Sequence, residues 1–480
     1  MSKSALWTLL GIAGLVLIAV VVLVFGGEEE LPPLDPVPLE ISYRTTRLTE
    51  PLTPGGHVDY LAVLNAGTPP PAEENATVAL LRVLGTGVMR GRMQEGLDEL
   101  GAPPGLPVEG SFVEQEFDTP LLEDVATASE EELVALDAWL STNEEALQGF
   151  VDACGRPSLW GPLTRDLQTG YVVQRVEEHW ASPLVNALAQ RAELRRVRGD
   201  VGAGWADAKA LLAWSRLLNQ RPGILARLLE RGAGELALDW LVRVLESGRM
   251  PEAMAREALG LLQRHVPADR LARDLDEYER FVLLGSFTAQ MVRDLEPGGE
   301  PPLVHEAYVA LNPALQAIND AYDEALPLLR TPSPAHDAEL DRIVTARAEH
   351  YRQLGRALDA EGPAAADVLD SIRRGDDKIA RTAGDLVAST GLVLLHLAAK
   401  RYRAHVDQRA TVTLALALHL HHLDHGTYPE DAHALVPAYL ADIPISFATG
   451  EPMPYDQVTG ACRIGSGDHA IELPPPAAGR

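Results

Sequence analysis

The apolar run Ala5–Phe25 constrains this chain more than any other feature of its sequence. It contains no charged residue, and at 1.5 Å of helical rise per residue about 20 such residues cross the hydrocarbon core of a bilayer. Two glycines and the acidic triplet Glu28–Glu30 follow it directly. We therefore expect an uncleaved transmembrane helix, with residues 5–25 binding the membrane.

A cleavable signal peptide is the alternative for this run. The apolar region of a signal peptide usually has about 7–15 residues and ends at a small-residue cleavage site. The run here is longer, and acidic residues come directly after it. Lys3 and the terminal amine precede it, so the positive-inside rule predicts a single-pass protein of the inner membrane. Its N-terminus would be cytoplasmic and its body exported to a periplasm-like space.

Five parts are expected along the chain. The segment Leu31–Pro38 is rich in proline and predicts an extended, semi-rigid spacer after the anchor. In chain order the parts are a transmembrane anchor (1–27), a Pro-rich extended linker (28–56), a helical body (57–296), a second helical block ending in a long helix (303–425), and a small cap with a tail (426–480).

The composition predicts a mainly α-helical body and argues against polyanionic partners. Hydrophobic residues make up 46% of the chain but aromatic residues only 5%, so leucine, alanine and valine supply the apolar mass. These residues suit helix packing better than a large β-sandwich. The formal net charge is −28 and no basic stripe is visible, so we expect no nucleic-acid partner.

Helical periodicity with short glycine and proline breaks continues from residue 57. Helices are expected over His57–Ala66, Glu74–Leu100, Ser129–Gly155 and Asp269–Arg293, with Ser129 as an N-cap. Between residues 182 and 265 the expected breaks are 198–200, 221–223 and 248–251, and one helix face carries Trp205, Ala208, Leu212, Ser215 and Leu218. The turn-and-helix pattern predicts a helical-hairpin array, although no fixed repeat period runs through three units. Three i,i+4 charge pairs predict an exposed face on the last helix: Arg270/Asp274, Arg273/Glu277 and Asp276/Arg280.

The second half is also expected to be helical up to residue 426. A proline-rich break is expected at 331–334, and the apolar segment Val387–Ala399 predicts a buried helix, with a second membrane segment as the alternative. After residue 426 we expect an α+β cap. It comprises a short helix over Glu430–Leu440 and a β-meander over Ile445–Leu473.

A histidine cluster at the end of the long helix is the main candidate for chemistry. His421 and His425 are spaced i,i+4, while His422 and His425 are spaced i,i+3. Either pair could offer two imidazoles to Zn²⁺ or Cu²⁺ on one helix face. A metal site needs further ligands that spacing does not supply. The sequence favours a polar helix end where histidine suits the helix dipole, so no metal or other cofactor is expected.

Other reactive residues are interpreted as structural. Glu178 and His179 are neighbours on a helix and point about 100° apart. Cys154 and Cys462 lie far apart in sequence, which leaves open whether they pair, and Cys154 has no assignable base. The chain has no Gly-x-Ser-x-Gly elbow, phosphate-binding loop or dinucleotide fingerprint, and no catalytic residue is predicted.

Several segments of the body resemble a family of uncharacterised membrane-anchored proteins from planctomycete-like bacteria. The matching residues are Asp59–Asn65, Glu74–Ala76, Leu80–Arg82, Trp139-Leu140, Asn143 and Arg156-Pro157. The resemblance covers most of the body and implies no known activity.

The C-terminal segment resembles the head of type II secretion major pseudopilins. The matching residues are His425-Gly426-x-Tyr428-Pro429, Leu435-Val436-Pro437-x-Tyr439-Leu440, Pro444 and Gly450-x-Pro452. The resemblance implies a long helix that leads into a short helix and a small sheet. The chain lacks the glutamate of the pseudopilin processing site, and Ile445-Ser446 replace the acidic residue that follows the proline.

These observations predict a membrane-anchored, exported, non-enzymatic scaffold or interaction protein of the cell envelope, with protein partners there. Two alternatives are kept. One is a component related to a type II secretion or pilus machine. The other is an exported metal-dependent hydrolase that uses the His419–His425 cluster.

Overall fold

The computed structural model describes most of the chain beyond the predicted anchor. The described residues are 39–88, 97–98, 100–113, 125–165, 172–173, 181–264, 271–291, 311–331, 333–359, 377–447, 449–458, 461–465 and 470–474. No helix among them is long and apolar enough to cross a membrane. The predicted anchor at residues 5–25 and the spacer Leu31–Pro38 lie outside the described residues, as does the expected domain boundary at 296–303.

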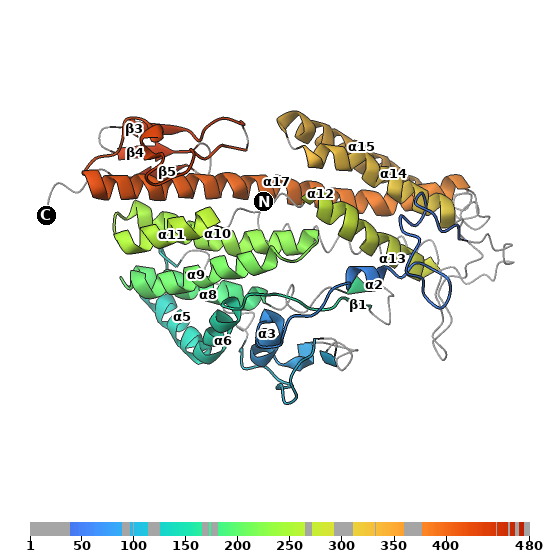
Figure 1. The fold of residues 1–480 in the computed structure, drawn as a ribbon, viewed down its shortest axis with the longest axis horizontal. Helices are drawn as coiled ribbons and strands as arrows, with labels where there is room; N and C mark the ends of the chain where they lie inside the picture. The colour runs from blue at the N-terminus through green and yellow to red at the C-terminus, as the bar shows by residue number, and fades with distance from the viewer. Residues whose placement is uncertain are drawn as a thin grey trace. The chain divides into compact units, whose positions relative to one another are not determined.

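The protein is mainly helical, with a small three-stranded antiparallel sheet near its C-terminus (Figure 1). The chain divides into two compact units. Unit 1 comprises residues 1–67, 163–173 and 270–397, and unit 2 comprises residues 68–162, 174–269 and 398–480. Each unit is therefore built from separate stretches of sequence.

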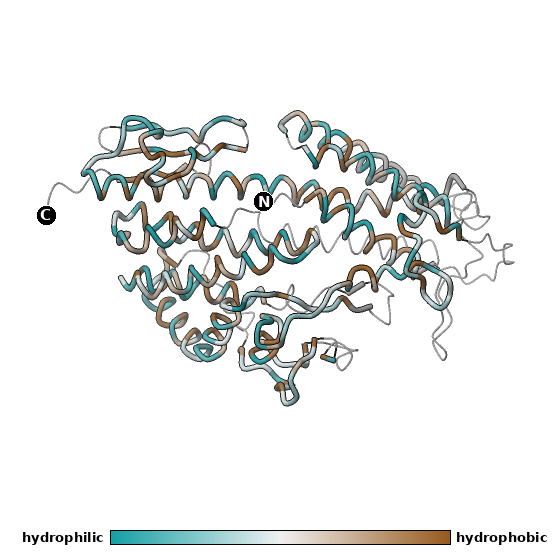
Figure 2. Tube along the Cα trace, in the orientation of Figure 1, coloured by the Kyte–Doolittle hydropathy of each residue, from teal (hydrophilic) through white to brown (hydrophobic). Residues whose placement is uncertain are grey.

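Four successive helices form the middle of unit 2, and the breaks between them confirm the prediction. They are α8 (Ser182–Val197), α9 (Val201–Leu218), α10 (Ile224–Glu246) and α11 (Glu252–Arg264). Helix α9 packs against both α8 and α10 (Figure 1). Hydrophobic and hydrophilic residues alternate along these helices in Figure 2, as expected for elements that bury only part of their surface. The predicted face of α9 is buried at Trp205, Ala208, Ser215 and Leu218, while Leu212 is half-buried.

Two predicted helices of unit 2 are shorter than expected. The helix expected to reach Leu100 is α3 (Ala76–Leu84), followed by the 3-10 turn η1 (Thr86–Val88). It ends because Gly85 adopts φ 76° and the backbone of Val108 lies where a side chain at this position would stand. The helix expected from Ser129 to Gly155 is divided into α5 (Glu130–Thr142) and α6 (Glu144–Cys154).

Asn143 marks the division between α5 and α6. Its side chain is fully buried and accepts a hydrogen bond from the backbone N–H of Val113 at 2.8 Å. The predicted N-cap at Ser129 is confirmed: its hydroxyl accepts from the N–H of Glu132, whose carboxylate in turn accepts from the N–H of Ser129.

The C-terminal part of unit 2 consists of one long helix and the small sheet. Helix α17 (Asp377–His425) supplies residues 398–425 to this unit. The 3-10 turn η4 (Ala432–Leu435) replaces the longer helix expected over Glu430–Leu440. Strands β3 (Tyr455–Val458), β4 (Ala461–Ile464) and β5 (Ile471–Leu473) form an antiparallel meander, which confirms the prediction. Ile464 and Leu473 of the sheet belong to the same buried cluster as Leu416 and Leu420 of α17.

Unit 1 contains the other helices of the described residues. They are α2 (Tyr60–Leu64), α12 (Leu271–Asp274), the π-helical turn η2 (Leu275–Glu279), α13 (Arg280–Met291), α14 (Leu311–Arg330), α15 (Pro334–Asp359) and residues 377–397 of α17. The short strands β1 (Thr164–Arg165) and β2 (Val172–Val173) pair antiparallel. Within the apolar segment expected to be a buried helix, Ala388, Leu392 and Leu395 are fully buried in α17.

The charged helix expected over Asp269–Arg293 is interrupted by the π-helical turn, and its predicted exposed face is only partly correct. Arg273 and Glu277 pair at 2.7 Å on the surface, as predicted. Asp276 and Arg280 also pair, at 3.2 Å, but Arg280 is fully buried. The expectation of an exposed face is therefore wrong at Arg280, because this side chain lies between α13 and α14 instead of in solvent. Arg270 lies outside the described residues.

Candidate functional site

The predicted histidine cluster occupies the last turns of α17 in unit 2, but its members have different surroundings. His419 is buried, and its Nε2 atom lies 3.0 Å from the carbonyl oxygen of Met250. A neutral imidazole donates this bond through Nε2–H, which also fixes its tautomer. His422 is half-buried, and its ring packs against Tyr428 with 4.8 Å between the ring centroids. These two histidines thus contribute to packing.

His421 and His425 stack on each other one helical turn apart. Their ring centroids are 4.2 Å apart, and the ring planes differ by 17°. Nδ1 of His421 lies 3.0 Å from the carbonyl oxygen of Thr427, and Nδ1 of His425 lies 3.1 Å from that of His421. Each ring is therefore held by a backbone carbonyl as well as by its neighbour.

This stacking does not present the histidines to a common metal ion. The lone pair of an imidazole nitrogen lies in the ring plane, and Zn²⁺ binds it at about 2.0–2.1 Å. Because the two rings are stacked and nearly parallel, their lone pairs lie in two nearly parallel planes. They therefore cannot both point at one metal ion between the rings. In the part of the chain that the structure describes, no group of three or more His, Cys, Asp or Glu side chains could hold a metal ion.

Asp424 lies beside the stacked pair in a second set of contacts. Its carboxylate accepts a 2.6 Å hydrogen bond from the Tyr439 hydroxyl and pairs with Arg256 of α11 at 3.2 Å. The hydrogen bond from Tyr439, with Arg256 adding a smaller effect, lowers the pKa of Asp424. Burial and the carboxylate together raise the pKa of Tyr439 to about 12. The Tyr439 hydroxyl therefore remains a proton donor in a structural contact between α17 and the segment after η4.

Acidification is expected to destabilise unit 2 through His419 and His422. Burial lowers the pKa of both imidazoles, with the charge of neighbouring histidines adding to it. A folded-state pKa below the unfolded value of about 6.5 means that the unfolded chain binds more protons. Stability is then full above about pH 6.5 and is lost as the pH falls through the lower folded-state pKa values.

Hydrogen exchange of α11 and residues 410–425 between pH 7.5 and 5.0 measures this loss, after correction for intrinsic exchange rates. The variant His419→Gln keeps a donor for the Met250 carbonyl but cannot titrate, so its stability should fall less steeply with pH. Peptides of unit 1 serve as the internal control and should respond equally in the parent and the variant. Identical slopes in unit 2 for parent and variant would rule out His419 as the titrating group.

The two cysteines are buried and are not linked. Burial raises the pKa of the Cys154 thiol, and it raises that of Cys462 to about 12. Both thiols therefore stay protonated at neutral pH, which does not suit a nucleophile. Glu178 and His179 lie outside the described residues.

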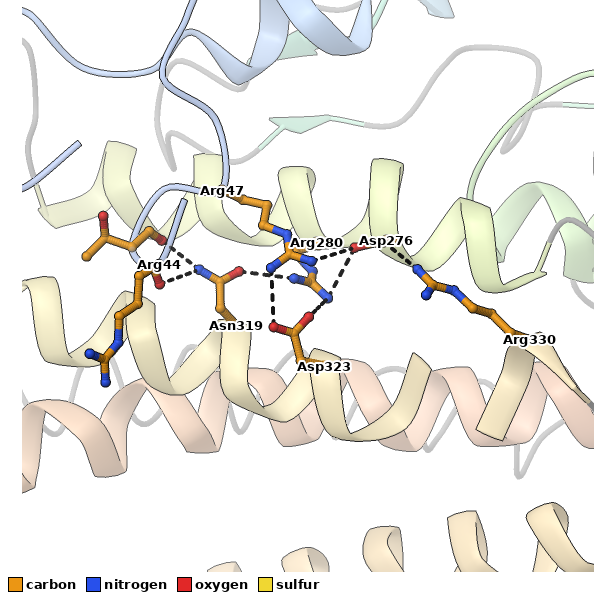
Figure 3. Close-up of polar contacts among 8 residues, drawn as sticks. Arg44, Arg47, Asp276, Arg280, Asn319, Asp323 and Arg330 are labelled. Atoms are coloured by element: carbon orange, nitrogen blue, oxygen red, sulfur yellow. Dashed lines mark hydrogen bonds and ion pairs between the residues drawn. The ribbon is translucent and has the colours of Figure 1, made fainter. Parts of the chain in front are cut away.

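A second polar cluster, in unit 1, was missed by the sequence analysis (Figure 3). Arg280 of α13 pairs with Asp276 at 3.2 Å and with Asp323 of α14 at 2.8 Å. Arg47 pairs with Asp323 at 3.2 Å, and Arg330 pairs with Asp276 at 3.1 Å. Three guanidinium groups thus share two carboxylates around a fully buried arginine.

Asn319 of α14 connects this cluster to the segment that precedes α2. It is 3% exposed, and its side-chain amide donates to the carbonyl oxygens of Arg44 at 3.1 Å and Thr45 at 2.7 Å (Figure 3). Its own oxygen lies 3.5 Å from a guanidinium nitrogen of Arg280. A sequence signal does exist, because Asn312, Asn319 and Asp323 fall on one face of a helix. The partners of all three positions, however, lie more than 270 residues away in the sequence.

Comparison with protein-family models, with curated proteins and with solved structures finds no match to this chain.

Proposed function

We propose that this chain is a membrane-anchored, exported, non-enzymatic scaffold of the cell envelope. The proposal rests on one observation about the two polar clusters. In each cluster, the carboxylates that could act in catalysis are engaged in structural hydrogen bonds and ion pairs. Asp424 is engaged by Tyr439 and Arg256, and the two carboxylates of the arginine cluster by three guanidinium groups. The apolar run Ala5–Phe25 supports the membrane anchor.

The body in this proposal presents protein-binding surfaces on a helical-hairpin array. Helices α8 to α11 follow one another with short connections, and α9 packs between two neighbours, which supports such an array. The stacked histidines give no support to the alternative of a metal-dependent hydrolase.

The test is affinity capture of the tagged full-length chain from cross-linked native membranes. A stoichiometric partner that returns in every preparation supports a scaffold. A variant without residues 1–27 is the matched control and should no longer be found in the membrane fraction. Turnover of a substrate by the purified chain, abolished by one side-chain substitution, would refute the non-enzymatic function.

A component related to a type II secretion or pilus machine is the second candidate. It is favoured by the order of the C-terminal elements, in which a long helix leads through a 3-10 turn into a three-stranded meander. The residues His425–Pro429 and Leu435–Leu440 resemble major pseudopilins in this region. Co-purification with pseudopilins from membranes supports this candidate, and a body that never associates with them refutes it.

A further inference from the structure

One face of α14 forms a continuous binding track for a segment far away in sequence. Asn312, Asn319 and Asp323 are spaced seven and four residues apart, which places them within about 20° of one line along a helix. All three contact residues between Glu40 and Arg47, which we call the strap. The track thus follows the strap over three turns of the helix.

The contacts hold the strap mainly through its backbone. The Glu40 N–H donates to the side-chain oxygen of Asn312 at 2.8 Å, and Asn319 donates to two strap carbonyls. The Tyr60 hydroxyl donates to the carbonyl oxygen of Thr46 at 2.5 Å. Thr45 and Thr46 are buried, at 0% and 1% exposure. Because these threonines are buried and the strap carbonyls are hydrogen-bonded, the strap is packed into unit 1 and is not a loop lying on its surface.

Side-chain ion pairs hold the C-terminal end of the strap. Arg47 reaches Asp323 at 3.2 Å and lies 3.8 Å from Asp276, while its guanidinium stacks on the exposed Tyr43 ring at 3.9 Å. The buried Arg280 pairs with the same two aspartates and holds them in place. The strap is therefore held at its start, middle and end by separate groups.

We propose that α14 uses this track to clamp the strap and thereby sets the length of the tether between the membrane anchor and unit 1. The proposal rests on the proposed membrane-anchored function. With the strap clamped, the tether ends before Glu40. A variant that frees residues 40–47 lengthens the tether by about 25 Å, at about 3.1 Å per extended residue.

Trypsin cleavage of the full-length protein tests whether the track holds the strap. Arg44 and Arg47 are tryptic sites within the strap, and the exposed Arg342 of α15 is a reference site in the same unit. Asn319→Leu removes both donors to the strap with little change in volume. We expect the ratio of strap cleavage to Arg342 cleavage to rise about 30-fold, as two hydrogen bonds of about 1 kcal/mol each imply.

Asp320→Asn is the matched control, because Asp320 is the next residue on α14, is exposed and pairs with Arg381 instead. Its cleavage ratio should equal that of the parent. Using the ratio separates strap release from general unfolding, which would raise cleavage at both sites. An unchanged ratio in Asn319→Leu overturns the proposal.

The tether length is measured on the full-length chain in phosphatidylcholine–phosphatidylglycerol vesicles. A donor dye at Ala346→Cys, an exposed position of α15, reports energy transfer to an acceptor lipid. Asn319→Leu should lower the transfer, and Asp320→Asn should not. A chain that releases its strap but stays off the vesicles refutes the membrane-anchored function and supports strap release. Unchanged transfer on vesicles, despite strap release, overturns the tether role.

Discussion

Replacing Arg280 with alanine is expected to lower the free energy of unfolding of unit 1 by about 3 kcal/mol. Arg280 is fully buried and pairs with Asp276 at 3.2 Å and with Asp323 at 2.8 Å (Figure 3). Its loss removes these charge-assisted bonds and leaves a void beside the Tyr322 ring, which lies 5.4 Å from its guanidinium carbon. Arg47 and Arg330 retain part of the pairing, so the expected loss is at the lower end for a broken buried ion pair.

Arg273→Ala is the matched control on the same helical stretch. Arg273 makes an i,i+4 pair of the same chemistry with Glu277, but both side chains are more than half exposed. Its replacement should leave the stability of unit 1 close to that of the parent, because exposed ion pairs contribute little. Hydrogen exchange in α13 and α14 is the proper measurement, because a chain with two units need not unfold in a single transition. Equal effects of the two substitutions would show that Arg280 contributes no more than a surface charge.

Gly204→Ala is expected to destabilise unit 2 by about 2–3 kcal/mol, although alanine favours helices. A Cβ atom at Gly204 would stand 2.8 Å from the Trp240 ring and 2.9 Å from the carbonyl oxygen of Ala192. That oxygen also accepts the indole N–H of Trp240 at 3.0 Å. Helices α8, α9 and α10 therefore meet at a point where only a hydrogen atom fits, and the backbone of α8 cannot move aside cheaply.

Gly232→Ala provides a control of opposite sign in the same unit. Gly232 lies within α10, and a Cβ atom there would meet nothing within 4 Å. The substitution should raise stability by about 0.5–1 kcal/mol through helix propensity alone. Denaturant unfolding of both variants, monitored by hydrogen exchange in α9 and α10, gives the comparison. If both glycines respond with the same sign, the close approach at Gly204 is not a constraint.

The sequence predicts the local features of this fold better than its long-range pairings. The breaks at 198–200, 221–223 and 248–251 and the N-cap at Ser129 depend on nearby residues, and all are confirmed. The lengths of α3 and of the 129–155 helix depend instead on Val108 and Val113, which approach from elsewhere in the chain. Local periodicity contains no information about such contacts.

The candidate sites differ in the same way. The position of the histidine cluster at the end of a long helix follows from periodicity, and α17 ends at His425. The stacking of His421 on His425 depends on side-chain rotamers, which spacing alone does not fix. The arginine cluster was missed because Asp276 and Arg280 have the spacing of a surface pair. Arg280 is buried only because α14 and the strap pack over it.

The division of the sequence between the units has a consequence for how the protein is made. Unit 1 draws on residues up to 397, and unit 2 draws on α17 and on strands that end at Leu473. A ribosome that has synthesised the first half of the chain has therefore supplied neither unit with all its parts. Leu416 and Ile464 must emerge before the core around Trp240 can close. The nascent polypeptide thus stays incompletely folded until synthesis is nearly finished.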